Sequence, residues 1–292
     1  MSRPEPNDRT HLRTLTVEGS ERRYLLHYPP QYDAARPWPV VLSFHGSNSN
    51  GQIQLEFTAL NETADREGFI AVYPYGTSER ERLLFWNAGN CCGFAHKEKI
   101  DDVALVRALL DQLAGEFNID AARVYAAGMS NGAMMAYRLA SEMAEVFAAV
   151  ATVAGTMGTE TCHPSRPVPI IHFHGTNDEF VPLAGGVGRR SVTGTNHFSV
   201  EHSIRAWVDA NRCPPTPIVT SLPNAQDDGT STVRHVYGPG HEGSEVVLYL
   251  IRGAGHIWPG RPPRPYYLGK TTYNVVANDL IWEFFQRHSR GP

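Results

Sequence analysis

The sequence predicts an α/β fold, with a mostly parallel central sheet and helices on both of its faces. Short apolar runs bounded by Gly or Pro alternate with amphipathic helical segments along most of the 292 residues. The run WPVVLSFHG at 38–46 is apolar almost throughout, which is typical of a strand buried on both faces. No domain boundary, repeat or low-complexity linker interrupts the alternation. We therefore expect residues 1–292 to form one domain, with 1–12 as a flexible tail.

The N-terminal half opens with a predicted β-hairpin, because residues 14–17 and 23–28 flank Glu18-Gly19-Ser20. Strands are expected at 38–46 and 69–76, with a helix near 54–67 between them. A loop rich in polar and aromatic residues follows the second strand. A helix then begins at Asp101-Asp102, with an apolar stripe formed by Val103, Val106, Leu109, Leu110 and Leu113. The two aspartates fit N-cap and first-turn positions better than a catalytic pair.

The C-terminal half continues the alternation. Strands are expected at 123–128, 148–154, 168–175, 233–237 and 246–251. Helices are expected at 131–143, 200–211 and 274–288. The last of these carries Ile281, Phe284 and Phe285 on one face, as a helix that packs on a sheet should.

The composition excludes several classes of protein. Hydrophobic residues make up 41% of the chain, which is too many for a disordered protein. The 26 basic and 30 acidic side chains give a net charge of −4, which argues against binding nucleic acid or a membrane surface by charge alone. The longest apolar stretch, 146–154, is too short to span a membrane. The N-terminus has no apolar leader segment, so the protein is either cytoplasmic or lacks a leader that was removed.

The four cysteines show no CxxC spacing, so a zinc or thioredoxin-type site is not expected. Cys91, Cys92 and Cys162 each follow a strand and should lie at the carboxyl edge of the sheet. Cys213 follows a helix that runs back, so it should lie at the opposite edge. A disulfide needs Cα atoms about 4.4–6.8 Å apart. We therefore predict that Cys91 or Cys92 bonds Cys162, with Cys213 apart, as in an oxidising compartment.

The motif Gly128-Met129-Ser130-Asn131-Gly132 fits the G-x-S-x-G pattern of a nucleophile elbow. An apolar strand leads directly into it and a helical segment leads directly out. Such an elbow holds the serine on a tight turn above the sheet edge, where the helix N-terminus faces the reacting centre. The context favours Ser130 as a nucleophile over an ordinary Gly-rich turn.

A serine nucleophile needs a base and an acid that orients the base. In this architecture the chain order is serine, acid, histidine. Asp178 follows the buried strand at 168–175, with Glu179 as the alternative acid, and His256 follows the strand at 246–251. The carboxyl ends of parallel strands are where such sheets place their sites. The predicted triad is Ser130, Asp178 and His256.

The other histidines have weaker claims. His172 and His174 lie on one face of a strand, but no third ligand is spaced near them, so a metal is not expected. His174 is expected beneath the site. His45 precedes Ser130 in the chain and should shape the loop beside the site rather than act as the base. Four others give no positional argument: His197, His202, His235 and His241.

An oxyanion hole is expected to use two backbone N–H groups. One belongs to the residue after the nucleophile, Asn131, and the other to the loop FHGSNSNG, where Ser47 is our choice. Aromatic side chains should line the substrate pocket. Trp258 lies two residues after the predicted base, and Trp86 lies in a loop at the same edge, although both also fit buried supports. His45 is included as a residue near the substrate.

The motifs FHGSNSNG, WNAGNCCG, DDV, GMSNGAMMAYRLA, PIIHFHGTNDEFVP and GAGHIWPG resemble those of feruloyl esterases and polyhydroxybutyrate-depolymerase-like enzymes. The resemblance extends from about Leu25 to the C-terminal helix. It implies an α/β-hydrolase fold, the triad named above, no cofactor, and a usually secreted enzyme. Implied substrates are phenolic or acetyl esters of plant walls, or polyester. The chain departs from the pattern in having no leader and in its basic, Gly-rich segment 185–197, whose role the motifs do not predict.

A serine peptidase and a non-catalytic binding module are the two alternatives to an ester hydrolase. A serine peptidase would need the same triad, because the fold does not select between amides and esters. A non-catalytic binding module would require loss of the triad, and all three residues are present in order. The resemblance favours an ester hydrolase, with feruloyl, acetyl-polysaccharide and short polyester substrates all open. The oligomeric state is not predicted.

Overall fold

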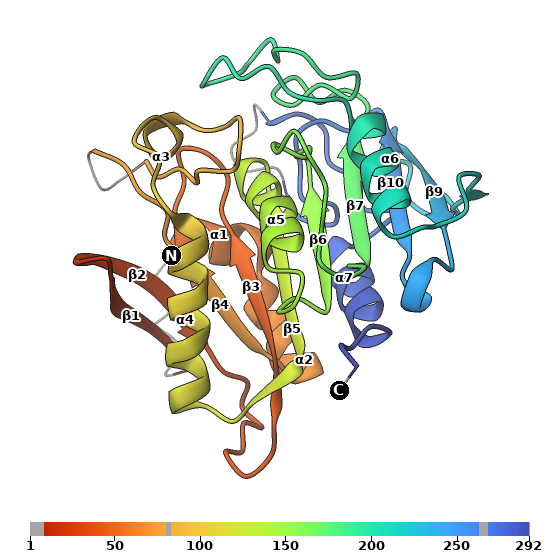
Figure 1. Ribbon diagram of the computed structural model, residues 1–292. Coiled ribbons are helices and arrows are strands. Elements are labelled where there is room, and N and C mark those ends of the chain that lie inside the picture. The colour runs from red at the N-terminus through yellow and green to blue at the C-terminus, as the bar shows by residue number, and fades with distance from the viewer. Residues whose placement is uncertain (1–8, 80–82, 263–267, 292) are drawn as a thin grey trace, which may run out of the picture.

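The computed structural model describes residues 9–79, 83–262 and 268–291. Ten strands in this part of the chain form one sheet, in the order β1-β2-β4-β3-β5-β6-β7-β10-β9-β8 (Figure 1). The pairs from β4 to β10 are parallel, and antiparallel strands extend the sheet at both ends. The predicted mostly parallel sheet is therefore confirmed.

The bounds of the elements lie close to the predicted ones. The strands are β1 (Thr10–Val17), β2 (Ser20–His27), β3 (Trp38–Phe44), β4 (Ile70–Pro74), β5 (Ile119–Met129), β6 (Ala149–Val153), β7 (Ile170–Gly175), β8 (Ile218–Ser221), β9 (Ser231–Tyr237) and β10 (Val246–Arg252). The helices are α1 (Gly51–Thr58), α2 (Leu60–Glu67), α3 (Gly93–Lys97), α4 (Asp102–Glu116), α5 (Asn131–Glu142), α6 (Val200–Ala210) and α7 (Ala277–Gln286), with a short 3₁₀ turn at His241–Gly243. Among the described helices, none combines the length and the apolar character needed to cross a bilayer.

The sheet separates two hydrophobic cores. Helices α4, α5 and α6 cover one face, and α1, α2 and α7 cover the other (Figure 1). Successive side chains of β3 alternate between the cores: Val40 and Leu42 belong to one, and Val41 to the other. This burial on both faces explains why the central strands read as continuous apolar runs.

Several elements differ from the prediction, including helix α3, which was not expected, and β5, which begins at Ile119 rather than at 123. The helix expected near 54–67 is two helices, because Ala59 adopts a left-handed conformation with φ 48° that ends one and begins the next. The edge strand β8 was not predicted, because all four of its residues are exposed and it lacks a buried face. The C-terminal helix begins at Ala277 rather than at 274. Strand β1 begins at Thr10, inside the expected tail 1–12, and residues 1–8 lie outside the described residues.

The arrangement of the parallel strands positions the candidate site. Strands β3, β5, β6, β7 and β10 are consecutive neighbours that point the same way, so their carboxyl ends meet at one edge. His45, Ser130, Asp178 and His256 each follow one of these ends. The fold therefore gathers residues that are up to 211 positions apart in sequence, the separation between His45 and His256.

Candidate active site

Ser130 occupies the turn between β5 and α5 with φ 57° and ψ −123°, a strained backbone conformation for a residue with a side chain. Strain of this kind costs about 1–3 kcal/mol and persists only where the surroundings impose it. Two glycines allow the close packing: a Cβ at Gly132 would lie 2.6 Å from the carbonyl oxygen of His45, and one at Gly46 would lie 3.3 Å from the Cβ of Ser130. The half-buried serine is thus held at the top of a tight turn, as a nucleophile elbow requires.

Asp178 and His256 are hydrogen-bonded, with 2.7 Å between the carboxylate Oδ2 and the imidazole Nδ1. The other carboxylate oxygen accepts the backbone N–H groups of Phe180 and Val181 at 2.8 and 2.9 Å. Burial opposes the charge of this carboxyl, but the neighbouring imidazole of His256 and these hydrogen bonds hold the pKa of Asp178 below its ordinary value. Because Nδ1 of His256 donates to the carboxylate, Nε2 is left as the basic nitrogen.

Glu179, the alternative acid, faces elsewhere. It forms ion pairs with Arg189 and with Arg190, the latter at 2.8 Å between Oε2 and Nε. The structure therefore brings Asp178, and not Glu179, into contact with His256.

A chain of buried hydrogen bonds lies beneath Asp178. The carbonyl of Val181 can only accept, so His174 donates to it through Nε2 at 2.9 Å. Nδ1 of His174 must then accept from Nε2 of His172 at 3.2 Å. In turn, Nδ1 of His172 lies 2.8 Å from the hydroxyl of Thr152 and 2.9 Å from that of Tyr137, and its one lone pair accepts from one of them. Burial lowers the pKa of both histidines, so the chain is neutral and ties the turn after β7 to the sheet.

The imidazoles of His172 and His174 are therefore hydrogen-bonded to protein partners and are not free to hold a metal. Within residues 9–79, 83–262 and 268–291, no three His, Cys, Asp or Glu side chains are grouped closely enough to bind a metal ion.

Ser130 lines two spaces. A small cavity of about 30 Å³ contains Ser47 and Asn131, the two residues expected in the oxyanion hole, on its wall. Asn131 is the first residue of α5, where backbone N–H groups have no acceptor within the helix. A larger pocket of about 450 Å³ is lined by both Ser130 and His256. The serine thus lies on the wall of both spaces.

The tryptophans expected in the substrate pocket are buried supports instead, so this part of the prediction is wrong. Trp86 and Trp258 have no exposed surface. The indole N–H of Trp86 donates to the carbonyl of His45 at 2.9 Å, and that of Trp258 donates to Oδ1 of Asn278 at 2.8 Å. The side chain of Asn131 fixes Trp86 further, because it bonds both its N–H and its carbonyl at 2.8 and 3.1 Å.

His45 is also buried and does not reach the substrate pocket. Its Nε2 accepts the N–H of Gly76 at 3.0 Å, so Nδ1 carries the proton and donates to the carbonyl of Gly46 at 2.8 Å. Burial lowers the pKa of His45 to about 4. Its expected role in shaping the loop is consistent with these bonds, and its assignment as a substrate contact is wrong.

The larger pocket has apolar walls that were not predicted. They come from α1, which starts just after the Ser47 turn, and from the loops after β7 and β10. The apolar side chains on this wall are Ile53, Phe57, Met129, Phe180, Val192 and Leu268. A sequence signal existed for the first two, because a helix that follows the oxyanion loop must start at the active edge.

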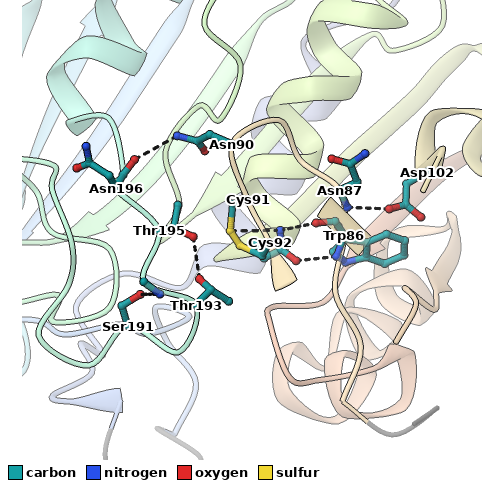
Figure 2. Close-up of a disulfide and its surroundings, with 12 residues drawn as sticks. Trp86, Asn87, Asn90, Cys91, Cys92, Asp102, Ser191, Thr193, Thr195 and Asn196 are labelled. Carbon is teal, nitrogen blue, oxygen red and sulfur yellow. Dashed lines mark hydrogen bonds between the residues drawn. A yellow bond between two sulfur atoms is a disulfide. The ribbon is translucent and has the colours of Figure 1, made fainter. Parts of the chain in front are cut away.

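The segment 185–197, which the motifs left unassigned, forms part of both spaces. Val192 lines the larger pocket and His197 the small cavity. The backbones of Gly186 and His197 bond each other in both directions at 2.9 and 3.0 Å. Figure 2 shows the side-chain amide of Asn90 reaching the carbonyl of Asn196, at 3.2 Å. The segment is therefore bound to the loop that carries Trp86.

Residues 22–211 match the family model described as "Esterase PHB depolymerase". The chain belongs to this family. It is 30% identical over 296 residues to a putative esterase, NocK, of Nocardia uniformis, with 97% of this chain and 84% of that protein covered. It is 28% identical over 270 residues to feruloyl esterase C of Emericella nidulans, with 90% and 83% covered. An acetyl xylan esterase structure from Aspergillus awamori superposes with a TM-score of 0.64 at 13% identity, covering 94% of this chain and 99% of that one.

These similarities confirm the predicted resemblance. The protein is an ester hydrolase with an α/β-hydrolase fold, as the motifs implied. The known enzymes differ in the esters that their names record, so the substrate of this esterase has to be argued from its own site.

The cysteines of the esterase are not paired as predicted. The structure joins Cys91 to its neighbour Cys92 (Figure 2) and leaves Cys162 as a free, half-buried thiol. Cys91 lies within 4.0 Å of the side-chain amide of Asn131 at the start of α5. Cys213 is a separate, buried free thiol, as expected.

The two aspartates before α4 have different roles. Asp101 caps the helix, because its Oδ1 accepts the N–H of Ala104 at 2.9 Å. Asp102 is a first-turn residue as predicted, but it is also fully buried in an ion pair with Arg22 at 2.8 Å. Its second oxygen accepts the N–H of Asn87 at 2.8 Å (Figure 2). It therefore connects the N-terminal hairpin to the loop beside the site.

Proposed function

We propose that this esterase hydrolyses esters of short acyl groups through an acyl-enzyme formed on Ser130. His256 is the general base, and Asp178 holds its tautomer. The observation that carries the proposal is the hydrogen bond of 2.7 Å between Asp178 and His256 beside a pocket that both His256 and the strained Ser130 line.

The chemical steps follow from this arrangement. The hydroxyl of Ser130 attacks the ester carbonyl while Nε2 of His256 takes its proton, and the adjacent Asp178 stabilises the imidazolium. The N–H groups of Ser47 and Asn131 stabilise the oxyanion. Collapse of the intermediate breaks the ester bond, and His256 returns the proton to the departing alcohol. Water then repeats the sequence on the acyl-enzyme and releases the acid.

Each of the two parts of the substrate can be assigned to one of the two spaces. His256 must protonate the departing alcohol, so the alcohol belongs in the pocket that His256 lines. The acyl group then belongs in the small cavity beyond Ser47 and Asn131. A cavity of about 30 Å³ admits about two water-sized groups. An acetyl group matches this narrow space better than a feruloyl group does. The pocket of about 450 Å³ has room for a sugar or another large alcohol.

A substrate panel tests the proposal. We expect acetylated xylan and p-nitrophenyl acetate to be hydrolysed with a higher kcat/KM than p-nitrophenyl octanoate, methyl ferulate or polyhydroxybutyrate. The Ser130→Ala variant should lose at least about 1000-fold in kcat while its circular dichroism spectrum stays native. Retained activity would refute Ser130 as the nucleophile. Faster hydrolysis of methyl ferulate than of acetyl esters would refute the assignment of the two spaces.

A further inference from the structure

A third space lies apart from Ser130, in a cleft between helix α6 and the strands β9 and β10 (Figure 1). Its volume is about 820 Å³, which is larger than either space beside Ser130. Sites for small molecules have volumes of about 300–1,000 Å³. The described residues that line this cleft include none of those that line the two spaces beside the serine. The cleft is therefore a separate place for a ligand.

The floor of the cleft is largely apolar. Leu248 of β10 lies opposite His235 of β9, and Leu250 and Tyr237 each lie two residues further along the same strands. All four side chains therefore project from one face of the sheet. Helix α6 and the loop after β7 add five apolar side chains, those of Pro182, Leu183, Ala184, Val200 and Ile204. These walls suit the apolar body of a ligand, which gains by leaving water.

Arg205 places a cation on the wall of this apolar cleft. Its guanidinium carbon lies 5.7 Å from the centre of the Tyr237 ring, and Nη1 donates to the carbonyl of Pro215 at 2.6 Å. Within the described residues, Arg205 forms no ion pair with a carboxylate. A guanidinium has five N–H donors in a planar arrangement, and two of them can bond the two oxygens of one carboxylate. Arg205 thus has donors to offer to an anionic ligand.

The other titratable groups that line the cleft leave Arg205 as its cation. Burial, together with the charge of Arg252, lowers the pKa of His235, so this imidazole is neutral at pH 7. Asp178 borders the cleft, but its side chain has no exposed surface and is bonded to His256. Glu201 is exposed one helical turn before Arg205, and its charge opposes the binding of an anion. Removing that charge should therefore strengthen binding.

We propose that this cleft binds a small carboxylate with an apolar body, with the carboxylate group on Arg205 and the body on the floor that Leu248 and Leu250 form. The inference goes beyond the proposed function, because neither Ser130 nor His256 takes part. Both halves of the ligand contribute: a neutral analogue loses the attraction of Arg205, and a carboxylate without an apolar body loses the floor.

Calorimetric titration with 2-naphthoate and with 2-naphthamide, its neutral analogue of similar shape, tests the proposal. The enzyme is first treated with diethyl p-nitrophenyl phosphate, so that a phosphoryl group on Ser130 blocks the catalytic pocket. At low ionic strength we expect 2-naphthoate to bind about three- to fivefold more tightly than the amide. Arg205→Gln should abolish this preference, and Glu201→Gln should increase it about twofold or more. Arg107→Gln, which replaces an exposed arginine outside the cleft, is the matched control and should keep it.

The outcomes separate this inference from the proposed function. If the blocked enzyme does not bind 2-naphthoate, or if Arg205→Gln keeps the preference for it, the inference is wrong. Displacement of 2-naphthoate by an equal concentration of acetate would also refute it, because acetate lacks the apolar body. If the phosphate reagent does not label Ser130, the proposed nucleophile fails instead. The comparison of Arg205→Gln with the native enzyme then still decides the inference in the unlabelled protein.

Discussion

Replacing Arg22 by methionine removes one partner of a buried ion pair and keeps most of the apolar volume. Arg22 is 7% exposed and Asp102 is fully buried, with 2.8 Å between the guanidinium and the carboxylate. Burial raises the pKa of Asp102, and the charge of Arg22 opposes this shift. In the variant the carboxylate keeps its bond from the N–H of Asn87 and has lost its ion-pair partner.

The expected loss of stability is about 3–5 kcal/mol, because breaking a buried pair from one side leaves an uncompensated charge. The unfolding entropy is about 2.1 cal/mol/K per residue, or about 0.6 kcal/mol/K for 292 residues. The Tm should therefore fall by about 5–8 °C. Lowering the pH should narrow the difference in stability between the native protein and the variant. The folded-state pKa of Asp102 lies above its unfolded value and rises further without Arg22, so the variant gains relative stability as protonation neutralises the carboxyl.

Urea unfolding followed by circular dichroism at pH 7 measures the effect. Arg107→Met is the matched control, because the pair of Arg107 with Glu145 has both side chains 53% exposed and should contribute less than about 1 kcal/mol. Combining Arg22→Met with Asp102→Leu should destabilise less than the sum of the two single changes. The reasoning is wrong if Arg22→Met costs no more than Arg107→Met, or if the double change is additive.

Three further predictions concern the site. The pKa of His45 falls from 6.5 to about 4 on folding, so its contribution to stability is complete above pH 6.5 and is lost as the pH falls towards 4, by at most about 1.4 kcal/mol per pH unit. Urea midpoints between pH 7 and 4.5 should therefore fall less steeply in His45→Gln than in the native protein. An equal slope in the two proteins would contradict this. Gly132→Ala should lower kcat/KM at least about tenfold by displacing the elbow, whereas Gly115→Ala, whose Cβ would meet no described atom within 4 Å, should not. His174→Phe removes the bond to Val181 and should lower kcat for p-nitrophenyl acetate by about tenfold with KM little changed, and a change confined to KM would argue against a positioning role.

The sequence predicts the sheet and the placement of Ser130, Asp178 and His256 at one edge of it, because both depend on local patterns. Each central strand is an apolar run, and each of the three residues follows such a run directly. Parallel strands then place these residues at one edge without knowledge of any side-chain contact. The break at Ala59 was not predictable in this way, because alanine gives no sign of a left-handed backbone.

The orientation of side chains in the loops was not predictable, because contacts between distant parts of the chain determine it. Trp86 faces inward because Asn131, 45 residues later, bonds its backbone, and because its indole reaches the carbonyl of His45, 41 residues earlier. His197 showed no pattern in the sequence, since its place in the cavity depends on pairing with Gly186 across a loop. The residue types in these loops indicated a site at this edge of the sheet, but they did not indicate which side chains would face the substrate.

The pairing of Gly186 with His197 also has a consequence for enzyme design. Because the backbone bonds close the loop at its base, residues 187–194 at its tip can be lengthened, shortened or replaced without moving the histidine. The tip carries Ser191, Val192 and Thr193, which line the small cavity, and Val192 lines the larger pocket as well. Changes to this one loop should therefore alter both spaces beside Ser130 without moving its base.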